Sequence, residues 1–179
     1  MRPRLRKILI ECWKDLVEKE YAQRRVNSER SLQAAYWAKL NEALNPKTHR
    51  IFIEPQLSPD GGATRLFPDL VISNSQRVIA VIELKYQPRV NPSIIKDLNS
   101  LTALANADDI ALTADRYAGP QARSHPYELN DRVLYVWAGI HRQTPEDLIG
   151  GSPIICPALL EGRFLCLRAI TSREAAPVN

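Results

Sequence analysis

The spacing of apolar side chains predicts two helices at the start of the chain. Over residues 4–21, Leu5, Leu9 and Leu16 recur on one face, as they do in an amphipathic helix. Ser28 then provides an N-cap for a second helix, which continues to the proline at position 46. The chain therefore begins with two consecutive helices.

The rest of the chain reads mostly as strands, because β-branched and aliphatic runs alternate with turn residues. Strands are expected over residues 50–57, 66–73, 77–86, 109–113, 132–137 and 162–171. A third helix is expected over residues 93–106, and a helical turn over residues 144–151. This order of elements favours an α/β sandwich around a mixed sheet.

One predicted hairpin carries charge where a structural sheet would carry apolar residues. The segment FPDLVISNSQRVIAVIELKY, residues 67–86, places Asp69, Glu83 and Lys85 within two apolar runs. A turn centred near Gln76 brings Asp69 opposite Glu83, because both lie seven positions from it. Alternation along the second strand puts Glu83 and Lys85 on one face with Ile79 and Val81, and Val78, Ala80, Ile82 and Leu84 on the other.

Two opposed carboxylates in a buried strand pair need a cation. They repel each other, and when buried together one takes up a proton unless positive charge lies between them. Mg²⁺ suits such a site because it prefers oxygen ligands and keeps several waters. Lys85 could then orient or deprotonate a water, or offset charge on a phosphate. The alternative is an exposed, salt-bridged Glu-x-Lys edge, but this is the only Glu-x-Lys in the chain and its strand is apolar.

These residues resemble the signature of a known nuclease superfamily. Pro68-Asp69, thirteen intervening residues and then Glu83-Leu84-Lys85 are similar to the PD-(D/E)XK motif. The predicted helix, three strands, helix and further strand over residues 28–114 resemble the αβββαβ core of that superfamily, a restriction-endonuclease-like three-layer sandwich with a central mixed β-sheet flanked by helices. The helix after the motif lacks the Gln-x-x-x-Tyr of some exonuclease branches, so the subfamily stays open.

The resemblance implies a Mg²⁺-dependent endodeoxyribonuclease in which Mn²⁺ could substitute. Asp69, Glu83 and the backbone carbonyl of Leu84 would bind the metal, and Lys85 would assist the attacking water. DNA is the expected partner, RNA is not excluded, and cutting both strands would favour a homodimer. The alternative function is a non-catalytic domain of the same fold that binds nucleic acid or a partner protein.

The superfamily often adds a glutamate from the helix before the first strand, and Glu29 is the candidate here. At 100° per residue, Glu29 falls on the same helical face as Gln33, Tyr36 and Leu40, which must cover the sheet. As an acid at a helix start, Glu29 could equally serve only to complement the helix dipole. Both interpretations stay open at this point.

The charge distribution indicates where nucleic acid could bind. The net charge is +4; residues 1–30 contain nine Lys or Arg and five Asp or Glu, whereas the remainder contains fifteen of each. A basic arm of this kind can follow a phosphate backbone, although a solvated helix face has the same composition. The residues proposed for this contact are Arg2, Arg4, Arg6, Lys7, Arg89 and Lys96.

Other sequence features limit the function class. Cys12, Cys156 and Cys166 are far apart and no histidines are spaced as ligands, which argues against zinc and fits reduced, partly buried thiols in a cytoplasmic protein. No apolar run approaches the roughly 20 residues of a membrane span. We expect a single domain over residues 1–179, divided into a basic helical extension (1–27), a nuclease-like core (28–114), additional strands and loops (115–170) and a frayed tail (171–179).

Overall fold

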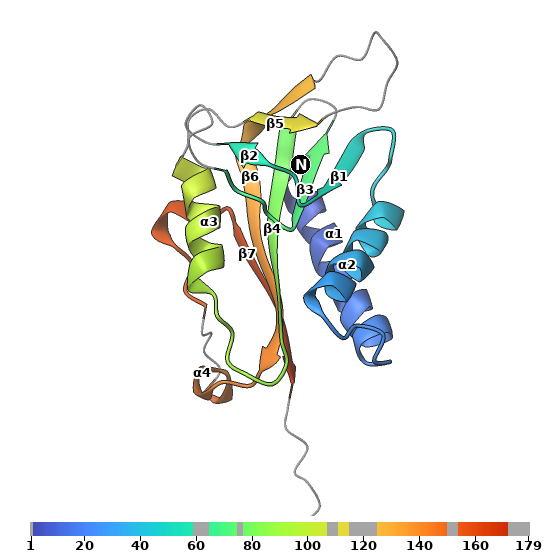
Figure 1. Ribbon diagram of the computed structural model, residues 1–179, viewed down its shortest axis with the longest axis vertical. Coiled ribbons are helices and arrows are strands. Elements are labelled where there is room, and N and C mark those ends of the chain that lie inside the picture. Colours follow the sequence, from blue (N-terminus) through green and yellow to red (C-terminus); the bar gives the residue numbers. More distant parts are fainter. Residues whose placement is uncertain are drawn as a thin grey trace, which may run out of the picture.

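A mixed β-sheet with helices on both faces forms the protein (Figure 1). The computed structural model describes residues 2–58, 65–74, 77–106, 111–114, 125–149 and 154–171, and in that part of the chain seven strands join one sheet. They are β1 (His49–Ile53), β2 (Leu57–Ser58), β3 (Leu70–Asn74), β4 (Arg77–Gln87), β5 (Ala111–Ala114), β6 (His125–Arg142) and β7 (Phe164–Thr171). The strand order is β1-β3-β4-β6-β5-β2, and β7 pairs with β6. The prediction of an α/β fold with a mixed sheet is confirmed.

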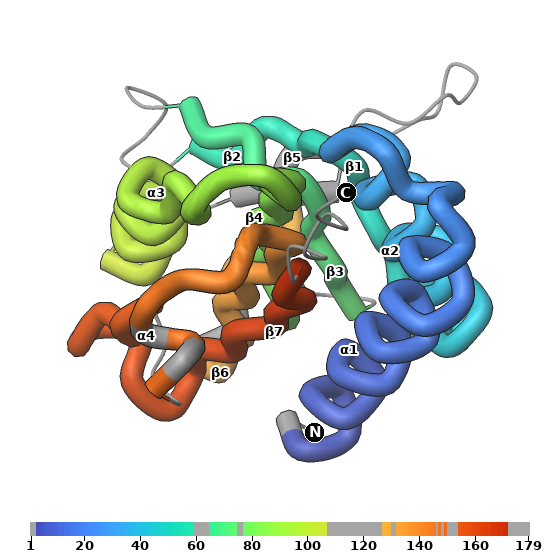
Figure 2. The backbone as a smooth tube through the Cα atoms, turned by 90° about the horizontal axis from the view of Figure 1, so that it is seen from below, coloured from blue at the N-terminus to red at the C-terminus, as the bar shows by residue number. Residues whose placement is uncertain are grey.

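Two long helices pack against one face of this sheet and a third packs against the other (Figures 1 and 2). The first face carries α1 (Arg2–Asp15), which continues into a π-helical turn over Leu16–Tyr21, and α2 (Glu29–Ala43). The second face carries α3 (Ile95–Asn106). Two short helical segments, α4 (Pro145–Leu148) and a 3₁₀ turn (Ala158–Leu160), lie in the connection to β7. Ser28 caps α2 as predicted, because its hydroxyl oxygen accepts from the Ser31 amide.

Each face of the sheet buries its own apolar cluster. Leu70 and Ile72 of β3 contribute to the cluster beneath α1 and α2, whereas Val71 contributes to the cluster beneath α3. The alternation follows from the period of two along a strand. Tyr36 ties α2 to α1, since its buried hydroxyl donates to the Leu9 carbonyl over 3.0 Å. Both faces of β3 and β4 are therefore covered, which explains their nearly continuous apolar sequence.

The strand expected over residues 50–57 is divided in two. β1 ends at Ile53, and Glu54 then adopts a left-handed backbone conformation with φ of 45°. Pro55 follows, and a proline cannot donate to a sheet ladder. The chain leaves the β1 register at Glu54 and re-enters the sheet as β2 on the other side, where it pairs with β5.

The strand beside β4 is β6 rather than the segment predicted at residues 109–113. β5 forms close to that prediction, but it pairs antiparallel with β6 toward the sheet edge. β6 pairs parallel with β4 from Arg77–Glu128 to Gln87–His141, and parallel with β7 on its other side. The predicted strand over residues 132–137 was therefore too short, and it belongs to the centre of the sheet.

A β-bulge at Ile79 changes the expected side-chain directions at the start of β4. Ile72 pairs with Ala80 but Ser73 pairs with Val78, which leaves Ile79 as an extra residue. Val78 consequently packs beneath α3 with Val81, and Ile79 packs beneath α1 and α2. The predicted faces of Val78 and Ile79 were wrong, whereas those of residues 80–86 were right. The turn at Gln76 and the tail after residue 171 lie outside the described residues.

Within the ranges that the structure describes, no helix is both long enough and apolar enough to cross a bilayer.

Candidate functional site

The site forms where β3 stops and β4 continues. Leu70 is the first paired residue of β3 and lies opposite Ile82, so Asp69 comes to the level of Glu83. This is the register predicted from the sequence. Beyond Ile82, the edge of β4 that faced β3 is no longer paired with that strand, and side chains replace it.

Two carboxylates take the place of the missing strand. The Leu84 amide donates to Oδ2 of Asp69 over 2.6 Å, and the Tyr86 amide donates to Oε2 of Glu29 over 3.2 Å. In a strand the amide and carbonyl of one residue point to the same edge, so the Leu84 carbonyl also faces Asp69 and Glu29. A backbone oxygen and two carboxylates therefore converge at this edge of β4.

The backbone of Asp69 is held in place by two donors. The Glu54 amide donates to the Asp69 carbonyl over 3.0 Å, and the Gln33 side-chain amide donates to the same oxygen over 3.1 Å. Gln33 also donates to Oε1 of Glu54 over 3.3 Å. Residues from α2 and from the end of β1 thus fix the position from which the Asp69 carboxylate reaches β4.

The Glu83 side chain points to the face of the sheet that α3 covers, where it is buried and accepts a hydrogen bond from one hydroxyl group. The residue is 9% exposed, and its Oε1 accepts from the Ser100 hydroxyl of α3 over 2.9 Å. Its own strand is apolar on this face, with Val81 buried two residues earlier. One oxygen of Glu83 is held by Ser100 and one oxygen of Asp69 by Leu84, so the second oxygen of each carboxylate can serve a cation.

Burial sets the protonation of this carboxylate pair. It raises the pKa of Glu83 to about 8, and the neighbouring charge of Asp69 adds to the increase. The hydrogen bond from Ser100 acts in the opposite direction and lowers the pKa. Burial also raises the pKa of Asp69 to about 6, although the Leu84 amide opposes it. Glu83 and Asp69 are therefore not both ionised at neutral pH unless positive charge enters the site.

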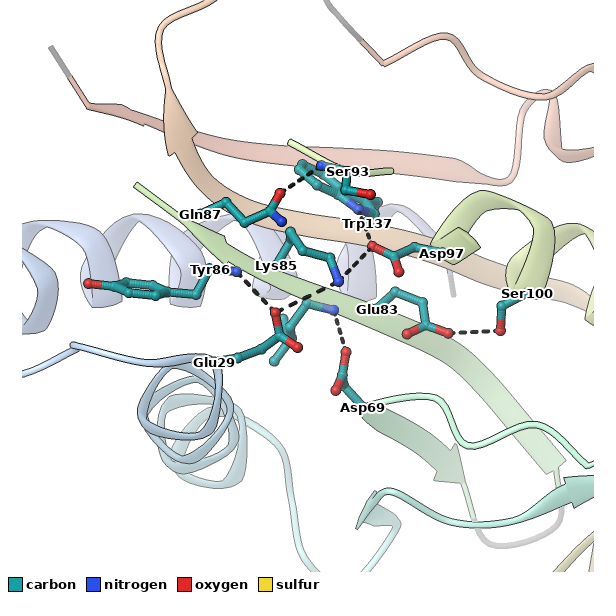
Figure 3. A network of polar contacts seen from close by, with 11 residues as sticks. Glu29, Asp69, Glu83, Lys85, Tyr86, Gln87, Ser93, Asp97, Ser100 and Trp137 are labelled. Carbon is teal, nitrogen blue, oxygen red and sulfur yellow. Dashed lines mark hydrogen bonds and ion pairs between the residues drawn. The ribbon is translucent and has the colours of Figure 1, made fainter. Parts of the chain in front are cut away.

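Lys85 lies between two further carboxylates (Figure 3). Its Nζ is 3.3 Å from Oδ2 of Asp97 and 3.8 Å from Oε2 of Glu29. Burial alone would lower the pKa of Lys85, but Asp97 and Glu29 outweigh it and the pKa is raised. The pKa of Asp97 is also raised, but here burial is the cause: it raises the pKa more than Lys85 and Trp137 lower it. Lys85 is thus held as an ammonium ion.

The predicted site residues come together. Glu29, Asp69, Glu83 and Lys85 occupy one corner, with Glu29 at the start of α2 on the side that faces the sheet (Figure 3). Three polar neighbours of these residues were not predicted from the sequence: Asp97, Ser100 and Trp137. Helical spacing could have identified Asp97, since it precedes the buried Leu101 and Leu104 by four and seven residues.

The basic residues proposed for DNA contact divide into two groups. Arg4 lines a pocket with Ile79 and Leu44, at the opposite end of β4 from Lys85. Lys85 lies six positions after Ile79 along the strand, about 20 Å at roughly 3.3 Å per residue. Arg6 and Lys7 lie with Arg4 on the first turns of α1, where Lys7 pairs with Glu11. The Arg2 side chain lies outside the described part of the structure.

The other basic residues are close in the chain to site residues. Arg89 lies two residues after the end of β4, and Lys96 immediately precedes Asp97 on α3; both are exposed. Arg30, also exposed, is next to Glu29 at the start of α2. Arg30, Arg89 and Lys96 are thus exposed and within four positions in the chain of Glu29, Lys85 or Asp97, and they make up a basic rim, whereas Arg4 lies by the opposite end of β4.

Asp69, Glu83 and the Leu84 carbonyl form an oxygen-only donor set, which suits Mg²⁺ or Mn²⁺. Across the described ranges, no three His, Cys, Asp or Glu side chains are grouped closely enough to hold a metal, so any ion there would rely on a carbonyl and water. The three cysteines have free thiols, and Cys156 is exposed rather than partly buried as expected. Comparisons with models of protein families, with curated proteins and with solved structures find no match for this chain.

Proposed function

We propose that this protein is a metal-dependent nuclease that hydrolyses phosphodiester bonds in DNA, with a restriction-endonuclease-like fold. One observation carries the proposal: Asp69 and Glu83 lie level on neighbouring strands, with Lys85 on the same face of β4 as Glu83. A structural hairpin gains nothing from two buried carboxylates whose pKa values burial raises, and the charge of Asp69 raises that of Glu83 further. A divalent cation would neutralise them.

Asp69, Glu83 and the Leu84 carbonyl would hold Mg²⁺, which would supply Lewis-acid polarisation of a phosphate and a more acidic water. Hydrolysis joins the water oxygen to phosphorus and breaks the bond from phosphorus to the bridging sugar oxygen. The water loses a proton and the released sugar oxygen gains one, which leaves a phosphate monoester and a sugar hydroxyl. Because Lys85 is an ammonium ion, it acts as a hydrogen-bond donor and positive charge, not as a base. Glu29 is 46% exposed and close to Lys85, so it can accept from a water at the open side.

The rim of the site fits a nucleic-acid substrate, and DNA is the one that the resemblance implies. Arg30, Arg89 and Lys96 are exposed next to the carboxylate corner, where they can contact phosphates on either side of a scissile bond. Cleavage of both strands of a duplex would use two copies of the corner, and a homodimer is the simplest arrangement that provides them.

Cleavage assays with matched variants test the proposal. Supercoiled plasmid, linear duplex, single-stranded DNA and RNA are incubated with wild type in Mg²⁺, Mn²⁺ or chelator. Asp69→Ala and Lys85→Ala should abolish cleavage. Lys39→Ala is the matched control, because Lys39 also lies between two carboxylates, Asp15 and Glu20, and is 20% exposed against 19% for Lys85. It should retain full activity.

Two outcomes would overturn the proposal. Equal cleavage by wild type, Asp69→Ala and Lys85→Ala would mean that a contaminant cuts the DNA. Binding of DNA without cleavage in either metal would instead support a non-catalytic nucleic-acid-binding domain. Cleavage of RNA alone would keep the chemistry and correct the substrate.

A further inference from the structure

A chain of contacts behind Lys85 begins at Gly139 on β6. Gly139 lies beside Lys85 in the parallel pairing of β4 and β6. A Cβ atom at Gly139 would lie 2.2 Å from Cη2 of Trp137, a distance that no side chain tolerates. The absent side chain therefore lets the Trp137 indole lie across its own strand, and this fixes the direction of the indole nitrogen.

The Trp137 indole orients Asp97. Trp137 is fully buried, and its Nε1 donates to Oδ2 of Asp97 over 3.1 Å. Asp97 lies in the first turn of α3 with its side chain 8% exposed. A buried carboxylate requires partners, and here the partners are the indole and the Lys85 ammonium, both on the same oxygen.

The two carboxylates beside Lys85 differ in how firmly they are held. Asp97 is buried, anchored by Trp137 and 3.3 Å from Nζ of Lys85. Glu29 is 46% exposed and lies farther away, at 3.8 Å. Glu29 can therefore move with a ligand or a water, whereas Asp97 cannot. Asp97 is thus the carboxylate that holds the Lys85 ammonium group in one position.

We infer that Asp97 is a positioning residue, which anchors the Lys85 ammonium over the Asp69–Glu83 corner and is itself set by Trp137 and Gly139. The inference rests on the proposed nuclease function. Asp97 is not among the ligands assigned to the metal, and its contact toward the site is Lys85, so we expect its effect to pass through Lys85. Without Asp97, the flexible lysine chain samples other rotamers and its charge leaves the reacting phosphate.

Asp97→Asn isolates the contact. The amide oxygen still accepts from Trp137, but the charge that holds Lys85 is gone. We expect the cleavage rate at saturating DNA to fall at least about tenfold, the range for a lost charge-assisted hydrogen bond, while DNA affinity changes less than about threefold. The rise in melting temperature on adding Mn²⁺ should remain, because the metal ligands are untouched. A merely structural defect would lower all three readouts together.

Two further variants protect the test against a folding failure of Asp97→Asn. Trp137→Phe removes the donor and keeps the ring, and Gly139→Ala displaces the indole. Both should reduce the cleavage rate in the same direction as Asp97→Asn. Thr102→Val is the control on the same helix, because its hydroxyl contacts only the Leu98 carbonyl in the described structure. It should leave cleavage unchanged.

A double-mutant cycle in unfolding tests the contact without any nuclease assay. For Lys85→Met and Asp97→Asn, the double variant's unfolding constant should differ at least about fivefold from the value that the two singles predict. The Lys39 and Asp15 pair, 2.7 Å apart, serves as the reference cycle. Additive effects within twofold, or full cleavage by Asp97→Asn, would overturn the inference and leave the nuclease proposal standing. If wild type does not cleave DNA but the double-mutant cycle is non-additive, the nuclease proposal and the positioning role of Asp97 in catalysis are both rejected. Only the ion pair between Lys85 and Asp97 would then stand.

Discussion

The Leu84 amide donates a 2.6 Å hydrogen bond to Oδ2 of Asp69, and this bond replaces the strand pairing that ends at Leu70. The same bond opposes the rise in the pKa of Asp69 that burial causes. Asp69 therefore both completes the edge of β4 and carries charge into the site. These two roles can be separated by substitution.

Asp69→Asn should keep the fold and lose the metal. The Asn carbonyl oxygen can still accept from Leu84, while removal of the charge relieves its repulsion with Glu83. We expect the melting temperature in chelator to stay at or above that of wild type. Addition of Mn²⁺ should raise the melting temperature of wild type and not that of the variant.

Asp15→Asn is the control for this measurement. Asp15 is a carboxylate on α1 that pairs with Lys39 and Lys19. The variant should lose some stability and keep the full Mn²⁺-dependent increase. An equal increase in Asp69→Asn would show that the ion binds elsewhere.

The stability of the metal-free protein should fall as the pH rises through the range in which Glu83 ionises. Glu83 has a pKa of about 8 in the fold, against 4.5 for an unperturbed glutamate. Between these values the folded chain keeps a proton that the unfolded chain has lost. The protonated Glu83 therefore makes its full contribution to the free energy of unfolding below pH 4.5. This contribution falls by up to about 1.4 kcal/mol per pH unit as the pH rises and is lost by about pH 8. Asp69, with its pKa raised to about 6, acts in the same direction.

Urea unfolding in chelator at several pH values between 5 and 8 measures this effect. Glu83→Gln cannot ionise and should flatten the slope over that interval. Glu11→Gln is the control, since Glu11 is an exposed glutamate on α1, and it should leave the wild-type slope unchanged. A wild-type slope that Glu83→Gln does not reduce would contradict the assignment of the titration to Glu83.

The sequence predicted the register of Asp69 and Glu83 better than it predicted the sheet around them. The register of Asp69 and Glu83 followed from counting to a turn, and charge within an apolar strand stood out. The bulge at Ile79 left no such signal, because its neighbours Val78 and Ala80 are also apolar and a change of face leaves the hydrophobic pattern unaltered. Buried strands of this kind do not reveal their own irregularities.

Long-range pairing was the other feature that local patterns could not supply. β6 lies beside β4 although it starts 48 positions later, at His125 against Arg77, and nothing in the short predicted strand at 132–137 distinguishes a central strand from an edge. Asp97 was missed for a related reason. Its role depends on Trp137 from β6, so the contact exists only once that strand is placed.

Glu54→Gly should stabilise the protein. Glu54 has φ of 45°, a conformation that costs a residue with a side chain and not glycine. The gain should be about 0.5–1 kcal/mol, less whatever is lost with the 3.3 Å contact from Gln33. Denaturant unfolding measures it, with Gln56→Gly as the control, since Gln56 has no positive φ and should lose stability. Destabilisation of Glu54→Gly would mean that its contact with Gln33 outweighs the backbone strain.

DNA affinity should depend on the basic rim of the site and not on the start of α1. Arg30 adjoins Glu29 and Lys96 adjoins Asp97, whereas Arg4 lies beside Ile79 at the far end of β4. Each phosphate contact releases counterions, so Arg30→Ala and Lys96→Ala should each weaken binding and reduce the salt slope by about 1.

Arg4→Ala and Lys7→Ala make the matched comparison, because they remove the same charges from exposed positions on α1. Both should leave affinity and salt slope as in wild type. Fluorescence anisotropy with a short duplex in chelator, titrated with KCl, measures all four variants without cleavage. A reduced slope for Arg4→Ala alone would place the DNA along the N-terminal end of α1, as the sequence charge by itself suggested. The carboxylate corner would then lie too far away to act on the bound strand.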